Sequence, residues 1–188
     1  EDGVVYAFST RIVARRVVPQ AANPDPAATL PYVQPIIGAQ LTIKLDGGEQ
    51  GRAQAMFDDG GLVVLAQSDA GYRNLLTMLK IAYMDSEDAL RPGVTPEELC
   101  AHADGLILLS GGADGALGRL LRMGRRDEAA GFLDALRVAF DGRLYIEIQR
   151  HGMPEERATE PQFIDWAYAH NLPLVATNEP FFVGPEFH

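Results

Sequence analysis

The order of apolar and polar residues predicts strands and helices that alternate along most of this chain. The continuous apolar run at 62–66 is typical of a short strand buried on both faces, as in parallel sheets, and residues 105–110 predict the next buried strand. Between these runs, apolar residues recur at helical spacing: Tyr72, Leu75, Leu76, Leu79 and Tyr83. The alternation therefore favours an α/β fold with mainly parallel strands.

The predicted elements follow from this pattern. The strands cover about residues 35–43, 62–66, 105–110, 144–149 and 172–177. The helices cover about residues 72–83, 95–103, 115–123, 127–140 and 156–170, with an irregularity expected at Pro161. Ligands of α/β folds bind at the carboxyl ends of strands. Those ends are Gln40, Ser110-Gly111, Gln149 to His151 and Asn178-Glu179.

The amino-terminal part departs from this pattern. Residues 12–18 mix arginines into an apolar run, and Pro19–Pro26 is rich in proline and small residues. Because proline fixes φ and restricts the residue before it, we expect extended or disordered chain here. We therefore divide the sequence into an atypical Pro/Ala-rich segment, 1–33, and one domain, 34–188.

Composition narrows the classes of function. The 188 residues suffice for one domain, and Cys100 is the only cysteine, which excludes an intrachain disulfide and a cysteine-based zinc cluster. The net charge of −10 makes the chain a poor DNA binder by itself. No apolar run approaches the roughly 20 residues that span a bilayer, and the first residues lack the basic start of a secretory signal. We expect a cytoplasmic protein with no membrane partner.

Motifs of nucleophilic or nucleotide chemistry are absent from the sequence, so we predict no catalytic residue. Gly111-Gly112 follows a strand but lacks the Gly-Lys-Ser/Thr of a phosphate-binding loop. His102 and His170 lie near helix ends, and Cys100 lies on the apolar side of a short helix, so we assign them structural roles. The Glu155-Glu156-Arg157 run is interpreted as a solvated first helical turn.

One predicted strand has a polar face. Glu147 shares that face with Tyr145 and Gln149 because side chains alternate along a strand. The pattern leaves two interpretations open for Glu147. It faces either the polar interior of a barrel or solvent.

Five segments, in order and at similar spacing, resemble the PHP (polymerase and histidinol phosphatase) domain of bacterial DNA polymerase III alpha subunits. They lie at 34–38, 65–75, 105–112, 145–152 and 172–179. The Gln-Arg-His-Gly and Ala-Thr-Asn-Glu-Pro-Phe-Phe forms are most similar to the replicative type. The family domain is a distorted β/α barrel with a metal cluster at the strand ends, so the resemblance implies a partial barrel of this type.

The resemblance also implies that early barrel strands are missing. The family opens with a His-x-His strand and a Thr-Asp motif, and neither is present here. Ala7-Phe8-Ser9-Thr10-Arg11 resembles the end of the family helix that precedes Pro35-Ile36-Ile37-Gly38, which implies an insertion before Gln34. A frameshift or an artificial junction would also explain it. Because open barrel edges expose unpaired backbone, we expect marginal stability or dimerisation.

The family's ligand positions are mostly changed in this chain. Metal-competent members carry Glu at the position of Gln40, His at that of Gly61, and Asp and His at those of Glu179 and Phe181, while His151 keeps its identity. The resemblance thus implies a degenerate site with His151 and Glu179 as vestigial ligands. We expect no cofactor in this region, zinc or manganese only if the site were intact, and magnesium for the parent polymerase.

Three functions are compatible with these residues. The first is a non-catalytic PHP fragment of a replicative polymerase, which packs against the remainder of the alpha subunit and docks the proofreading exonuclease. It would meet the sliding clamp and DNA only through the parent protein. The second is a free-standing metal-dependent PHP-type phosphoesterase or 3′–5′ exonuclease, and the third is a simple interaction module unconnected with replication. The isolated chain is expected to be inactive under the first.

Overall fold

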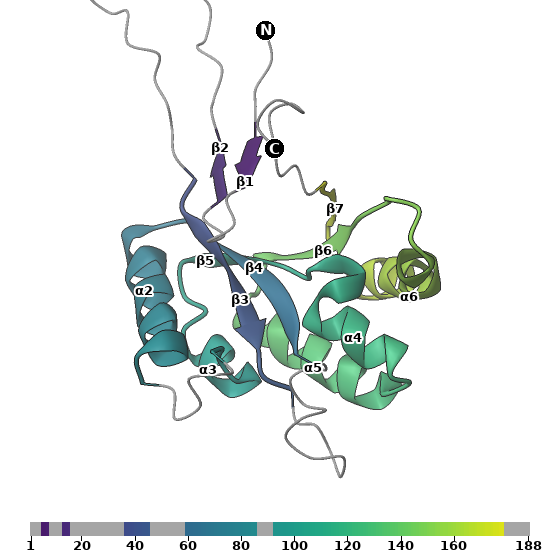
Figure 1. Cartoon of the computed structure of the whole chain (residues 1–188), viewed down its shortest axis with the longest axis horizontal. Helices are drawn as coiled ribbons and strands as arrows, with labels where there is room; N and C mark the ends of the chain where they lie inside the picture. The colour runs from purple at the N-terminus through teal and green to yellow at the C-terminus, as the bar shows by residue number, and fades with distance from the viewer. Residues whose placement is uncertain (1–4, 8–12, 16–35, 46–58, 86–91, 179–188) are drawn as a thin grey trace, which may run out of the picture.

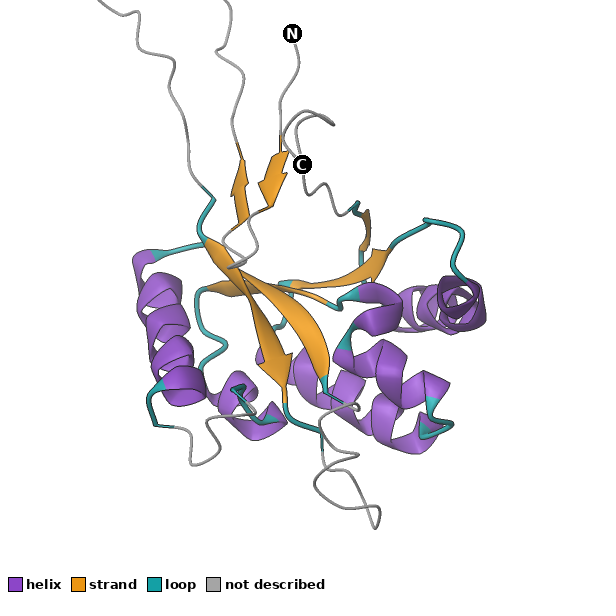
Figure 2. Ribbon diagram, viewed as in Figure 1, coloured by secondary structure: helices purple, strands orange, loops and turns teal. Residues whose placement is uncertain are grey.

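The centre of the protein is a five-stranded sheet (Figure 1). The computed structural model describes residues 5–7, 13–15, 36–45, 59–85 and 92–178. The sheet has the order β3-β4-β5-β6-β7, with bounds β3 Gly38–Ile43, β4 Gly60–Ala66, β5 Leu106–Leu109, β6 Leu144–Ile148 and β7 Leu174–Ala176. Two further strands, β1 Val5–Ala7 and β2 Val13–Arg15, form a separate antiparallel pair. They lie beyond the end of the sheet where β3 begins (Figure 2).

Five α-helices and one short 3₁₀-helix accompany this sheet in the part of the chain that is described. They are α2 Asp69–Tyr83, α3 Pro96–Ala101, η2 Gly112–Asp114, α4 Ala116–Arg122, α5 Arg126–Ala139 and α6 Pro154–His170. All five predicted helices are therefore confirmed. α6 continues through Pro161, so the irregularity expected there does not end the helix. None of the described helices combines the length and apolar composition that a bilayer span requires.

Strand direction corrects the expected topology. β3 pairs antiparallel with β4, and β4 with β5, whereas β5–β6 and β6–β7 are parallel. The prediction of mainly parallel strands is therefore wrong for half of the sheet. Burial alternates along β4, as expected for a strand with one open face and not for one buried on both faces. The sheet is also open over the described residues, so a mixed α/β architecture is shown and a closed barrel is not.

The helices cover one face of the sheet. Along β3, β4, β5 and β6, every second residue points to the same face of the sheet, and the apolar residues on that face are buried: Ala39, Leu41, Ile43, Leu62, Val64, Leu106, Leu108, Leu144 and Ile146. These side chains belong to one core with residues of α2, α4, α5 and α6. The residues between them point to the opposite side, which we call the open face. It is formed by Gln40, Thr42, Gly61, Val63, Leu65, Ile107, Leu109, Tyr145, Glu147 and Gln149.

Close backbone contact holds α2 against the turn before β5. A Cβ added to Gly71 would lie 1.8 Å from the carbonyl oxygen of Gly105, so only glycine fits this crossing. Asn74, one turn further along α2, donates a side-chain hydrogen bond to the carbonyl of Asp104 at 2.9 Å. Both residues belong to the Ala-Gly-Tyr-Arg-Asn-Leu segment of the resemblance, which therefore has a packing role.

Ala7 lies in a strand, which corrects a second expectation. The interpretation of residues 7–11 as the end of a helix is wrong at Ala7, which pairs with Val13 in the β1–β2 ladder. Residues 8–11 lie outside the described part of the chain. The reason for the error is local, because a short Ala-Phe-Ser-Thr-Arg run has no periodicity long enough to separate helix from strand.

Candidate functional site

Polar side chains converge where β5, β6 and β7 end. The carboxylate of Glu147 accepts hydrogen bonds from the backbone N–H of Gly111, at 2.9 Å, and from the hydroxyl of Thr177. Gln149 donates from its amide to the Thr177 hydroxyl oxygen at 3.3 Å. The hydroxyl of Ser110 accepts from the Glu147 N–H at 2.8 Å. We call this set the strand-end network, and it ties three neighbouring strands together.

Strand alternation places Glu147 in this network. The side chain points to the open face, yet its residue is only 4 % exposed, because the ends of the neighbouring strands enclose it. The parallel register sets Glu147 opposite Val175, so that Thr177 follows directly on the same face. Of the two interpretations left open for Glu147, solvent exposure is therefore wrong and the enclosed polar position is correct.

A second group of contacts surrounds His151. Its ring Nδ1 lies 2.7 Å from Oε1 of Glu156, and Nε2 lies 2.5 Å from Oδ1 of Asn178. The carboxylate of Glu156 also accepts from the backbone N–H groups of His151, at 2.8 and 3.0 Å, and of Met153, at 3.0 Å. We call these contacts the His151 latch, because they join the end of β6, the start of α6 and the end of β7.

Glu156 corrects the interpretation of residues 155–157 as a solvated helical turn. It is a buried residue, and three N–H groups face its carboxylate, two of them from the backbone of His151 and Met153. Burial opposes its ionisation, but hydrogen bonds from the backbone and ring of His151 and from the Met153 N–H outweigh burial and lower the pKa of Glu156 to about 2. The carboxylate is the cap that starts α6 in the absence of a Ser, Thr, Asp or Asn at the preceding position.

This lowered pKa predicts acid sensitivity. A folded-state pKa of about 2, below the ordinary 4.5, means that ionised Glu156 stabilises the fold above pH 4.5 and loses that contribution as the pH falls towards 2. We expect the free energy of unfolding of Glu156→Gln to be lower at neutral pH and to vary less between pH 4.5 and 2 than that of the unmodified chain. Urea unfolding at a series of pH values measures both. Glu97→Gln, which removes an exposed carboxylate from α3, is the matched control, and parallel profiles for all three proteins would contradict the prediction.

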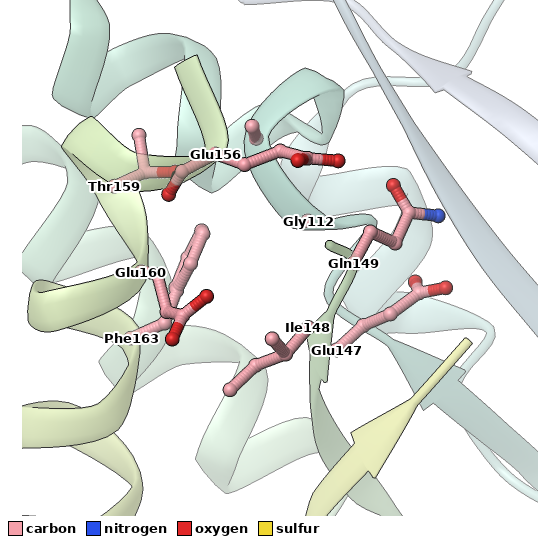
Figure 3. Close-up of a pocket in the computed structure, with 9 residues that line it drawn as sticks. Gly112, Glu147, Ile148, Gln149, Glu156, Thr159, Glu160 and Phe163 are labelled. Carbon is pink, nitrogen blue, oxygen red and sulfur yellow. Dashed lines mark hydrogen bonds between the residues drawn. The ribbon is translucent and has the colours of Figure 1, made fainter. Parts of the chain in front are cut away.

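A small pocket lies between the end of β6 and the first turns of α6 (Figure 3). Ile148 and Phe163 point into it, Glu156 and Glu160 line it from α6, and the carboxylate of Glu147 points to the other side of the strand. Its empty volume is about 180 Å³, open to solvent. Pockets for small molecules usually hold about 300–1,000 Å³. The space is therefore a gap in helix–strand packing and not a formed ligand pocket.

Two of the positions that the resemblance predicts to have lost a ligand lie side by side on the open face. Gln40 and Gly61 are diagonal neighbours in the β3–β4 ladder. A Cβ added to Gly61 would lie 2.1 Å from Nε2 of Gln40, so the amide of Gln40 occupies the space next to Gly61. Glu179 and Phe181 lie outside the described residues, so their assignment stays a prediction. Within the described ranges, no group of three or more His, Cys, Asp or Glu side chains could hold a metal ion.

Comparison with known proteins identifies the family. The model of the PHP domain matches residues 8–151. The chain belongs to the PHP domain family. The match begins within the predicted atypical segment, 1–33, so the boundary at residue 34 stays a prediction. The predicted resemblance to this family is confirmed.

Three relatives of this PHP domain share one name. It is 42% identical over 156 residues to the DNA polymerase III subunit alpha of Caulobacter vibrioides, covering 83% of this chain and 14% of the relative. It is 33% identical over 156 residues to that of Vibrio cholerae, covering 82% and 13%, and 32% identical over 163 residues to that of Thermus aquaticus, covering 85% and 13%. The chain thus spans about one seventh of the length of these relatives.

The other residues considered from the sequence, His102, His170 and Cys100, lie at helix ends or against the core of the PHP domain. His102 follows α3 and its Nδ1 lies 2.8 Å from the carbonyl of Glu98. His170 is the last residue of α6, at the helix end that favours a cation. Cys100 is half-buried against the core, and burial, with a smaller effect of Glu97, raises the pKa of its thiol. A raised thiol pKa makes Cys100 a poor nucleophile at neutral pH.

Sequence reasoning missed the partners that organise the site. The sequence pattern indicates only a strand end at Thr177 and a surface position at Glu156, but Thr177 donates a hydrogen bond to Glu147 and Glu156 contacts the ring of His151. The sequence does contain a signal for Glu156. This residue stands three positions after Met153, which precedes the proline that starts α6, and that is the position of the acidic residue in a capping box. No comparable signal marked Thr177, because its partner Glu147 is 30 residues away in the chain.

Proposed function

We propose that this chain is the PHP part of the alpha subunit of a replicative DNA polymerase III, and that it acts there as an architectural module. Its metal site is degenerate, and it docks the proofreading exonuclease. Support comes from the similarity over more than four fifths of the chain to relatives that are all named DNA polymerase III subunit alpha.

The strand-end network is the main structural support for the proposed architectural role. Zinc or manganese needs several carboxylate or imidazole ligands that converge on one point with free lone pairs. Here the carboxylate of Glu147 is bonded to Gly111 and Thr177, and both ring nitrogens of His151 lie against oxygens of Glu156 and Asn178. These groups join strand ends to one another directly.

Gln40 and Gly61 add to this argument. A neutral amide is a weaker ligand for these cations than the carboxylate or imidazole of metal-competent relatives, and glycine offers no side chain at all. The amide of Gln40 fills the space beside Gly61. The described residues therefore do not fit a metal cluster, and we assign no catalytic step to them.

Partners and catalysis belong to the parent protein in this proposal. The parent extends DNA with magnesium at carboxylates outside the region that these 188 residues match. A net charge of −10 opposes binding to phosphates, so DNA and the sliding clamp are met through the remainder of the alpha subunit.

Metal content and exonuclease binding test the proposal together. The purified chain is incubated with zinc or manganese, dialysed, and assayed for bound metal and phosphoesterase activity, while the full alpha subunit is co-purified with its own exonuclease subunit. We expect far less than one metal per chain, no phosphoesterase activity, and co-elution that is lost when this domain is deleted. Tightly bound metal with phosphoesterase activity would support the free-standing enzyme instead, and co-elution without the domain would contradict the docking role.

A further inference from the structure

Large exposed apolar side chains gather on one helix. Of the ten that the described residues contain, four lie on α2 or directly after it: Tyr72, Leu76, Tyr83 and Met84, which are 41, 48, 68 and 77% exposed. Isolated exposed apolar residues are ordinary on soluble proteins, but a contiguous group of them marks an interaction surface.

Helical geometry places Tyr72, Leu76 and Tyr83 on the same side of α2 as Leu79. Residues 72, 76, 79 and 83 are spaced by four, three and four, which places them in one stripe about 16 Å long at about 1.5 Å per residue. Leu79 is partly buried against the core, so it anchors the stripe to the fold. We call Tyr72, Leu76, Leu79 and Tyr83 the α2 stripe.

Cations flank the α2 stripe in an otherwise acidic chain. Arg73 and Lys80 are seven residues apart and therefore lie along the same edge of the helix. Arg73 is exposed and makes no ion pair with any other described residue. Lys80 pairs with Asp85 at 2.8 Å, but both side chains are exposed, and such pairs contribute only about 0–1 kcal/mol. Asp69 and Asp85 lie at the two ends, so the middle of the stripe is bordered by positive charge.

These charges disfavour a second copy as the partner. A twofold axis through the middle of two antiparallel α2 helices would bring Arg73 of one chain towards Lys80 of the other. Like charges in contact oppose association, whereas carboxylates at the same places would favour it. An acidic partner is thus the one that the charges fit.

We propose that the α2 stripe is a docking surface for an acidic amphipathic segment of another polypeptide. Its apolar side chains pack along Tyr72, Leu76 and Tyr83, and its carboxylates approach Arg73 and Lys80. This surface is on the side of the molecule formed by α2, apart from the strand-end network, and the proposal does not depend on the role assigned to that network.

Peptide binding tests the α2 stripe directly. The probe is a fluorescein-labelled synthetic helix with leucine at every third or fourth position and glutamate at the flanking positions, and fluorescence anisotropy measures its affinity for the full chain. We expect saturable binding that weakens as salt rises, and a matched peptide with lysine in place of glutamate that binds at least about tenfold more weakly, a difference of about 1.4 kcal/mol.

Variants distinguish binding at the α2 stripe from nonspecific binding. Leu76→Asp is expected to abolish binding of the acidic peptide, and Arg73→Glu to weaken it about tenfold. Val138→Asp, at a residue of α5 that is 83% exposed, should leave binding unchanged. Circular dichroism confirms that each variant is folded, as expected for exposed positions. Equal binding of both peptides, binding that survives Leu76→Asp, or a dimer of the unmodified chain that Leu76→Asp dissociates would each overturn the proposal.

Discussion

Gly71→Ala is expected to destabilise the domain by about 3 kcal/mol or more, at the upper end of what overpacking costs. The new Cβ would lie 1.8 Å from the carbonyl oxygen and 2.4 Å from the carbonyl carbon of Gly105. Both atoms are backbone, so no side-chain rotation relieves the clash. The same carbonyl accepts a hydrogen bond from the N–H of Gln67 at 2.9 Å, and moving it would break this bond as well.

Urea unfolding followed by circular dichroism measures this effect. Gly131→Ala is the matched control, because Gly131 is an exposed glycine within α5 and an added Cβ there meets nothing within 4 Å. That substitution should stabilise the protein by about 0.5–1 kcal/mol, the helix preference of alanine over glycine. Similar unfolding curves for the two variants would show that the contact between Gly71 and Gly105 is not tight.

Glu147→Ala is expected to cost about 2–4 kcal/mol, because it leaves the Gly111 N–H and the Thr177 hydroxyl without their acceptor in an enclosed position. For a protein of this size, that loss corresponds to a melting temperature lower by about 5–15 °C. Glu147→Gln keeps the size and one acceptor oxygen, so we expect an intermediate loss. Thermal melts of the three proteins provide the comparison.

A double-mutant cycle isolates the contact between Glu147 and Thr177. The strand-end network predicts that Thr177→Val costs less in the Glu147→Ala background than in the unmodified chain, with a coupling of about 0.5–3 kcal/mol. Adding zinc or manganese should change none of these melting temperatures under the proposed function. If the effects of the two substitutions were strictly additive, the contact between Glu147 and Thr177 would not be a source of stability.

Gly71 and Glu147 both lie in segments that carry the family resemblance. Gly71, Asn74 and Gly105 belong to the segments that carry the family resemblance, and all three hold α2 to the turn before β5. Glu147 and Gln149 belong to another such segment and hold the strand ends. These family segments therefore correspond to packing and hydrogen-bonding positions within this chain.

Much of the fold was predictable from local patterns. Every predicted strand and helix between residues 35 and 177 is present, with ends that differ by a few residues. The helix at Pro96 shows why, since Thr95 and Glu98 form the capping box that their spacing predicts. Such signals act within a few residues and do not need the rest of the fold.

The candidate site was only partly predictable. Position and residue type placed Glu147, Gln149 and His151 at strand ends, and the structure places them there. The burial of Glu156 was not predicted, because a Glu in the first turn of a helix is exposed unless a loop folds back over it. Here residues 151–153 do so and direct their N–H groups at its carboxylate.

The sequence by itself determined the positions of the helices and of the main-sheet strands of this protein and its membership of the PHP family. Those properties depend on the spacing of side chains over a few residues and on family motifs. Only the tertiary structure decided which strands run antiparallel, that the sheet is open, and which groups hold Glu147. Strand direction depends on the path of the connecting chain, and the bond between Gly111 and Glu147 joins residues 36 positions apart. Such contacts form only when the elements pack together.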